Sequence, residues 1–183
     1  LDLLRDDQGR TAGITLHVLG ERTVDGVGAV RARAVVLATG GMGQVFSSTT
    51  NPSVSTGDGV ALALRAGAEV TDLEFVQFHP TVMWLGPDSH GQQPLISEAV
   101  RGEGAYLRDK FMNRFMLDVD PRAELAPRDV VAQAIVRCME RTKHPNVFLD
   151  LRHLDKAMVR RRFPGIEKLG RGFGLDITAD LIP

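Results

Sequence analysis

The chain has 183 residues, of which 43% are hydrophobic and 25% are charged, and its formal net charge is −1. This balance is that of an ordinary globular protein and excludes a disordered or fibrous chain. A net charge near zero also argues against nucleic acid or an anionic membrane as a general partner. No apolar run approaches the length of a membrane span. An anionic ligand would therefore need a local cluster of Arg and His side chains.

The single cysteine, Cys138, excludes an internal disulfide. It lies in a helical pattern, which favours a packed thiol over a reactive one. So few cysteines agree with a reducing, cytoplasmic location. The sequence starts without Met and stops in an apolar segment, so we expect a piece of a longer protein.

The first 38 residues have the pattern of β-structure. Residues 6–9 form a turn signal, and residues 12–18 alternate as in a half-buried strand. A polar turn is expected over 23–28. Residues 35–38 (VVLA) are continuously apolar, which is typical of a strand buried on both faces.

A glycine-rich turn, residues 39–43 (TGGMG), follows this strand and lets the backbone approach a ligand closely. Taken alone, the pattern favours an ordinary turn. A helix is expected over 58–68, with Gly67 at its C-terminal end. Asp58 falls at the start of this helix, either as a capping carboxylate or as a group that holds a cofactor hydroxyl beside the glycine-rich turn.

Alternation continues in residues 72–78, which predict a strand ending at a His-Pro pair. We place a domain boundary near 72–80. Residues 97–105 indicate a short helical turn interrupted by glycines, and residues 111–115 resemble a strand.

The clearest helix is predicted over 127–142, with proline at its first position. Its apolar positions recur with helical spacing: Val130, Val131, Ala134, Ile135 and Cys138. A strand is expected over 147–150. Residues 155–171 are helical and basic, and their arginine run favours a solvated face over an anion site.

Arg128 stands out because it occupies the first turn of the predicted helix, where the partial positive charge favours anions. An arginine there needs a negative partner, which Asp129, Glu124 or a bound carboxylate could supply. A dicarboxylate held between Arg128 and the helix amides fits this physics. His79 alone, before a proline, favours a structural role.

Together, several motifs resemble the succinate dehydrogenase/fumarate reductase flavoprotein family, and within it most closely the L-aspartate oxidases. They follow the family's order and spacing: residues 38–41 (ATGG) with 49–52 (TTNP) and 56–59 (TGDG), 74–81 (EFVQFHPT), 96–105 (ISEAVRGEGA) and 124–131 (ELAPRDVV). The tail, with residues 147–151 and 162–164, is also similar to aspartate oxidases.

The resemblance implies a role for each matching residue. His79 and Ser97 would bind a substrate carboxylate, and Glu98 would join the polar network around it. Arg128 would exchange a proton with the substrate carbon or stabilise charge beside it. Ser97 stands where threonine is commoner in the family, so the hydroxyl is kept and one methyl is lost. Either Glu98 or Glu103 could return the proton to Arg128.

The resemblance also implies non-covalently bound FAD and no metal. Asp58, Thr39, Gly40 and Gly41 would contact FAD. The implied fold is of the α/β (α+β) class. Residues 1–72 would form part of a Rossmann-like FAD-binding domain, and residues 73–183 a small α+β capping domain that covers the substrate.

The implied reaction is the oxidation of L-aspartate to iminoaspartate, an early step towards quinolinate and NAD. Hydride would pass from the substrate to the flavin N5 atom, and dioxygen or fumarate would reoxidise the flavin. The implied partners are a small dicarboxylate and a downstream quinolinate synthase, with neither nucleic acid nor membrane.

Two alternatives stay open. The first is a fumarate reductase or succinate dehydrogenase flavoprotein subunit, acting on fumarate or succinate. The second is an inactive fragment that serves only as a binding module. No G-x-G-x-x-G fingerprint occurs in the chain, and the family's further substrate-binding His and Arg would follow Pro183. We therefore expect these 183 residues alone not to retain FAD.

Overall fold

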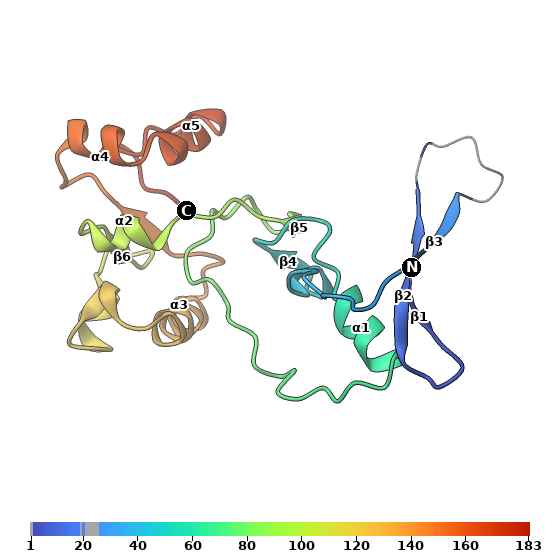
Figure 1. The fold of residues 1–183 in the computed structure, drawn as a ribbon. Coiled ribbons are helices and arrows are strands. Elements are labelled where there is room, and N and C mark those ends of the chain that lie inside the picture. Colours follow the sequence, from blue (N-terminus) through green and yellow to red (C-terminus); the bar gives the residue numbers. More distant parts are fainter. Residues whose placement is uncertain (1, 19, 21–25) are drawn as a thin grey trace. The chain divides into compact units, whose positions relative to one another are not determined.

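The structure is a computed structural model, and it describes residues 2–18, 20 and 26–183. The chain forms two compact units (Figure 1), one made of Leu1–Phe46 and Asn51–Phe75 and the other of Ser47–Thr50 and Val76–Pro183. The break after Phe75 lies near the boundary expected from the sequence. The assignment of 1–72 to a flavin domain and 73–183 to a cap stays a prediction.

The first unit contains an antiparallel sheet of three strands, in the order β1-β2-β3. The strands are β1 (Asp2–Arg5), β2 (Thr11–His17) and β3 (Val27–Arg31). The predicted turn at 6–9 is confirmed, because the Asp6 amide donates to the Arg10 carbonyl and the Asp6 carboxylate accepts from the Arg10 side chain. The turn predicted over 23–28 falls largely outside the described residues.

Helix α1 (Asp58–Arg65) confirms the helix predicted to begin at Asp58. Gly67 follows it with a φ of +89°, the left-handed conformation expected just past a helix end. The N-cap is Gly57, and no side chain caps the helix. Asp58 is therefore the first helical residue and not a capping carboxylate. A short 3₁₀ turn, η1 (Gly43–Val45), precedes the helix.

Two strands predicted from apolar patterns are absent from this part of the described chain. Residues 35–38 pair with no strand, and Val36 is 88% exposed. A strand buried on both faces needs neighbours on both edges, and the described residues supply none. Residues 72–78 form no strand either. Asp72 has a φ of +59°, and its carbonyl accepts from the Phe75 amide, which closes a turn.

The second unit holds the hydrophobic core. Its elements are β4 (Ser48–Thr49), β5 (Gly91–Gln92), α2 (Glu98–Gly102), β6 (Tyr106–Arg108), η2 (Phe115–Asp118), η3 (Ala123–Leu125), α3 (Arg128–Thr142), β7 (Phe148–Asp150), α4 (Lys156–Arg162) and α5 (Pro164–Gly172). Strands β6 and β7 are antiparallel, and β4 and β5 are parallel. The α/β class expected from the sequence is confirmed.

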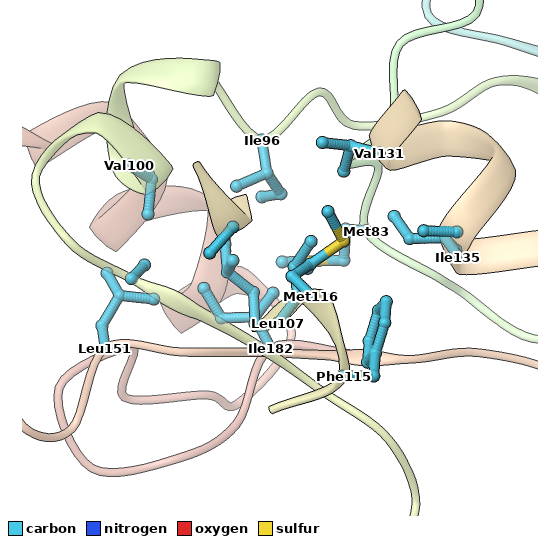
Figure 2. Packing of buried hydrophobic residues seen from close by; sticks show 14 of the residues in the cluster. Met83, Ile96, Val100, Leu107, Phe115, Met116, Val131, Ile135, Leu151 and Ile182 are labelled. Carbon is cyan, nitrogen blue, oxygen red and sulfur yellow. The ribbon is translucent and has the colours of Figure 1, made fainter. Parts of the chain in front are cut away.

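Apolar side chains from the loop before α2, from β6, from η2 and from α3 converge on one cluster (Figure 2). Its fully covered members include Met83, Ile96, Leu107, Met116 and Val131. The predicted apolar face of α3 is confirmed, since Val131, Ala134, Ile135 and Cys138 are buried and Val130 packs against them. Burial raises the pKa of the Cys138 thiol, as expected for a packed cysteine.

Three details of this unit differ from the sequence predictions. Pro127 is the N-cap of α3 and not its first helical residue. Residues 111–115 form no strand, because the Asp109 carboxylate accepts from the amides of Phe111 and Asn113 and curls the backbone into a tight turn. The region 155–171 divides into two helices at Phe163, just before Pro164.

Candidate active site

The clearest polar constellation of the second unit surrounds Arg128, the first residue of α3. Its Nε donates to Glu98 Oε2 at 2.6 Å, and its Nη1 donates to Gln77 Oε1 at 2.9 Å. Arg128 and Glu98 are both partly exposed, at 40% and 45% of their side chains. The guanidinium is therefore fixed in direction by two partners while part of it stays accessible to a ligand.

Glu98 is the negative partner that Arg128 needs at the start of a helix. The sequence had suggested Asp129 or Glu124 for this role. Glu124 instead pairs with Arg114 at 2.6 Å. The hydrogen bond from Arg128 lowers the pKa of the Glu98 carboxyl below its usual range, so Glu98 is a carboxylate at neutral pH.

His79 lies half-buried near the same charges. Burial is the main reason that its pKa lies below the usual value, and the positive charges of Arg128 and Arg101 act in the same direction. Its Nδ1 lies 3.1 Å from the Thr81 carbonyl oxygen and 3.3 Å from the Thr81 amide. Nδ1 can donate to the Thr81 carbonyl, which opposes the lowering of the His79 pKa, or accept from the Thr81 amide. In the second arrangement the neutral ring carries its proton on Nε2 and can donate it to a ligand.

Ser97 is the N-cap of α2, immediately before Glu98. Its Oγ accepts from the Ala99 amide at 3.3 Å. A hydroxyl that accepts through oxygen still has its own proton to donate. Ser97 is exposed, so it can cap the helix and donate to a bound carboxylate at once.

Arg101 is a member of the constellation that the sequence pattern did not reveal. Its side chain is only 1% exposed, and its Nη2 lies 3.8 Å from Glu98 Oε1. Its Nη1 donates to the Glu124 carbonyl, whereas Nε and Nη2 have no hydrogen-bond partner among the described residues. Arg101 lies in the 96–105 motif, three residues after Glu98, but nothing in a sequence shows that a given arginine is buried.

Glu103, the other carboxylate considered as a proton relay, has a different partner. It accepts from Arg162 of α4. The arginine run of α4 is thus exposed but paired in part, since Arg160 also forms an ion pair with Asp176. Among the carboxylates proposed as relays, Glu98 alone lies against Arg128 in the described contacts.

A groove of about 710 Å³ opens beside His79. Its lining is mostly apolar and comes from Phe78, Pro80 and one side of α3, including Ala132 and Val136. Arg128 and Glu98 are not part of this lining, so the groove and the charged constellation share only the His79 side.

The residues expected to contact FAD lie together in the first unit, around the start of α1. Gly40 and Gly57 have φ values of +72° and +84°. A Cβ added at Gly59 would lie 1.8 Å from Thr39 Oγ1, so the Thr39–Gly41 turn packs directly on the first helical turn. Asp58 is the acidic residue of that turn. Exposed backbone and a carboxylate beside a helix start fit the polar groups of a dinucleotide.

The second unit can therefore offer cationic and neutral hydrogen-bond donors to an anion. One carboxylate, Glu98, pairs with the cationic donor Arg128. The first unit can offer a glycine-lined turn to a nucleotide cofactor. Among the described residues, no group of three or more His, Cys, Asp or Glu is arranged to hold a metal ion. Nor does any helix in the described part of the chain have the length and apolarity needed to cross a membrane.

Comparison with known families identifies the family to which the chain belongs. The chain belongs to the FAD binding domain family, whose profile matches residues 1–183. FAD, the cofactor expected from the motifs, is thus confirmed.

Among curated proteins, the chain is similar to the L-aspartate oxidase of Streptomyces coelicolor, with 64% identity over 183 residues. It is 51% identical to the L-aspartate oxidase of Nostoc over 185 aligned residues, which cover 98% of this chain. The resemblance seen in the motifs is confirmed. The chain spans about a third of these relatives, 32% and 30% of their lengths.

Solved structures of fumarate reductases match as well. A variant of the E. coli quinol fumarate reductase superposes with a TM-score of 0.85 and 36% identity, covering all of this chain and 33% of that one. A quinol-fumarate reductase with menaquinol gives a TM-score of 0.84 and 35% identity over the same shares.

Proposed function

We propose that the chain is the central part of an enzyme that oxidises L-aspartate to iminoaspartate with FAD. The observation that carries the proposal is Arg128, held by Glu98 and Gln77 at 2.6 and 2.9 Å beside His79. The 64% identity to an L-aspartate oxidase supports the choice of substrate.

The proposed substrate is a dianion, and the donors around Arg128 suit one. Arg128 would bind a carboxylate with the guanidinium edge that Glu98 does not use. His79, neutral because its pKa is lowered, would donate from Nε2, and Ser97 would donate its hydroxyl proton. These groups would hold the substrate flat within reacting distance of the flavin. Glu98, already paired, would not repel the dianion as a free carboxylate would.

Bound FAD would supply the two-electron acceptor. Thr39, Gly40, Gly41 and Asp58 would contribute to holding it, as the packing of the turn against α1 suggests. The family's further FAD contacts would come from segments that the longer relatives carry.

Arg128 would also exchange a proton with the substrate. A free guanidinium hardly ionises, but the start of α3 disfavours an extra positive charge. Glu98 is hydrogen-bonded to Arg128 and lies 3.8 Å from the buried Arg101. A carboxylate between two guanidiniums is suited to pass a proton between them. Glu103, bound to Arg162, is not placed for that role.

The remaining assignments belong to the same proposal. Residues 1–72 would be part of the flavin domain and residues 73–183 the substrate cap. The enzyme would act in the cytoplasm, where a single cysteine stays a reduced thiol. A quinolinate synthase would use its product. Reoxidation would use dioxygen or fumarate.

The test uses the full-length protein, meaning this chain with the flanking segments that its relatives have. L-aspartate should bleach the flavin absorbance, and succinate should do so far more slowly. Bleaching by succinate and not by L-aspartate would replace the proposal with the fumarate reductase alternative. The 36% identity to the E. coli quinol fumarate reductase supports that alternative. The absence of bleaching by either would favour a binding module.

The Arg128→Leu variant tests the residue itself. It should abolish turnover and leave the flavin bound, because Arg128 lies in the second unit and the glycine-lined turn in the first. Full activity of this variant would remove Arg128 from the reaction.

A further inference from the structure

Glu124 is a buried carboxylate with every oxygen engaged. It is 3% exposed, and it accepts from Arg114 Nε at 2.9 Å and from Arg114 Nη2 at 2.6 Å. The Leu107 amide of β6 donates to it at 3.0 Å. Burial alone would raise the pKa of Glu124, but the hydrogen bonds from Arg114 and Leu107 outweigh it and hold the pKa below the usual range. Glu124 is therefore ionised at neutral pH.

The backbone of Glu124 is fixed as firmly as its side chain. The preceding residue, Ala123, has a φ of +48°, which is unfavourable for a residue with a Cβ and persists only where the surroundings hold it. The carbonyl that this backbone presents accepts from Arg101 Nη1 at 2.5 Å. The position of Arg101 thus depends on the conformation of η3, which the Glu124 side chain ties to β6 and to Arg114.

Arg101 in turn lies next to the Glu98–Arg128 pair, on the side of Glu98. Glu98 lies between Arg101, at 3.8 Å, and Arg128, at 2.6 Å. Burial lowers the pKa of Arg101 and the charge of Arg128 lowers it further, whereas the charges of Glu98 and Glu124 oppose this. His79 also interacts with Arg101. Glu98 is shared with Arg128, and the Glu124 carboxylate is shared with Arg114. Glu124 therefore acts on Arg101 through its backbone carbonyl, which accepts from Nη1, and more weakly through the charge of its carboxylate.

We propose that Glu124 is a positioning residue of the active site: it keeps Arg101 in place beside the Glu98–Arg128 pair, without touching the substrate. The proposal rests on the proposed function and adds to it a residue, Glu124, that contacts Arg101. It predicts that Glu124 affects the proton-handling step and not the binding of the dicarboxylate.

The test compares the full-length wild-type enzyme with the Glu124→Gln variant. We expect kcat for L-aspartate to fall roughly 10- to 100-fold, because a small displacement of Arg101 disturbs the pair in front of it. KM should stay within about twofold, since no substrate contact is lost. Without the negative charge of Glu124, which raises the pKa of Arg101, that pKa falls, so the alkaline limb of kcat against pH should move to lower pH.

Asp150 offers a matched control, because it is equally buried, 2% exposed, and bonded to Arg108 and Arg152 at 2.6 and 2.8 Å. The Asp150→Asn variant should lose stability and keep the wild-type kcat and alkaline limb. A wild-type kcat and pH profile for Glu124→Gln would overturn the proposal. An equal loss of kcat in both variants would do the same, because it would reduce the effect of Glu124 to stability.

A second variant covers the case in which Glu124→Gln does not fold. The double variant E124Q/R114Q removes both charges, so no lone charge is left buried, and its alkaline limb should still be shifted. If the double variant has the alkaline limb of the wild type, or if neither variant folds, Glu124 contributes to stability alone and the proposal is overturned. A wild-type enzyme that L-aspartate does not reduce would be a failure of the proposed function, which is a separate result.

Discussion

Arg128 shows how the surroundings of one residue can suit it to bind an anion. Its place at the start of α3 is electrostatically unfavourable, and the ion pair with Glu98 at 2.6 Å compensates for this. The result is a guanidinium that is oriented, partly exposed and coupled to a second, buried guanidinium through one carboxylate. Each of these properties can be tested at a single side chain.

Glu98 should matter for turnover and not for flavin binding. The Glu98→Gln variant keeps the shape of the side chain but cannot accept a proton as a carboxylate does. We expect kcat to fall by about 100-fold or more, with flavin content unchanged. Steady-state kinetics and the flavin absorbance of the full-length protein measure both quantities.

Glu103→Gln is the control for this change, because Glu103 closes the same helix and bonds to Arg162 instead. Its kcat should stay within about twofold of wild type, as for most surface substitutions. A similar loss in both variants would show that the carboxylate beside Arg128 has no special role.

Asp150 gives a prediction for stability against pH. Hydrogen bonds from Arg152, and to a smaller extent from Arg108, hold the pKa of the Asp150 carboxyl well below its usual value. A depressed folded pKa contributes stability that is complete above the unfolded pKa, near 3.8, and is lost as the pH falls towards the folded value. The Asp150→Asn variant should therefore be less stable by about 2–3 kcal/mol at pH 6.

The difference in unfolding free energy between wild type and the Asp150→Asn variant should become smaller at pH values below the unfolded pKa of Asp150. Urea unfolding at pH 6 and at about pH 3 measures this. A difference that stays constant between the two pH values would mean that the charge of Asp150 contributes no stability.

At the scale of elements, helices were predicted better than strands. The apolar spacing over α3 and the Gly67 end of α1 are local signals, and both are confirmed. The runs at 35–38 and 72–78 are not strands, because a strand also needs pairing partners, and the described residues supply none for either run. At 111–115 the Asp109 carboxylate accepts from two backbone amides and holds the chain in a turn instead of a strand. The hydrophobic pattern alone does not reveal these hydrogen bonds.

The same distinction applies to the site. Arg128, Glu98 and His79 were found because each belongs to a recognisable motif. Arg101 and Gln77 lie in the same motifs, but their contribution depends on burial and on a 2.9 Å contact that only the folded backbone creates. The roles of all five residues stay predictions until variants are measured.

Helix α3 should stabilise the second unit through one face only. Val131 is fully buried and Val136 is 53% exposed on the same helix. The Val131→Ala variant should lose about 2 kcal/mol of unfolding free energy through the cavity it leaves. The Val136→Ala variant should change it by less than about 0.5 kcal/mol. Both replace valine by alanine in a helix, so differences in helix propensity cancel, and urea unfolding of residues 76–183 gives the comparison.

At the scale of the whole chain, the hydrophobic core is unevenly distributed. All members of the buried cluster fall between Met83 and Ile182. The described part of the first unit contributes none and exposes Val36, Val45 and Leu64 at 88%, 63% and 56%. A three-stranded sheet with one short helix buries too little apolar surface to offset the entropy lost on folding. The two units should therefore differ in their ability to fold alone.

Residues 76–183 expressed alone should unfold cooperatively in urea and protect the amides of α3 and β7 from hydrogen exchange. This fragment lacks the segment Ser47–Thr50 of the second unit, and with it the pairing of Ser48–Thr49 with Gly91–Gln92 and the hydrogen bonds around that pairing. Residues 1–75 alone should show no cooperative transition. The same measurement on both fragments is decisive, because a cooperative first unit or a non-cooperative second one would mean that the buried cluster does not determine which part of the chain folds independently.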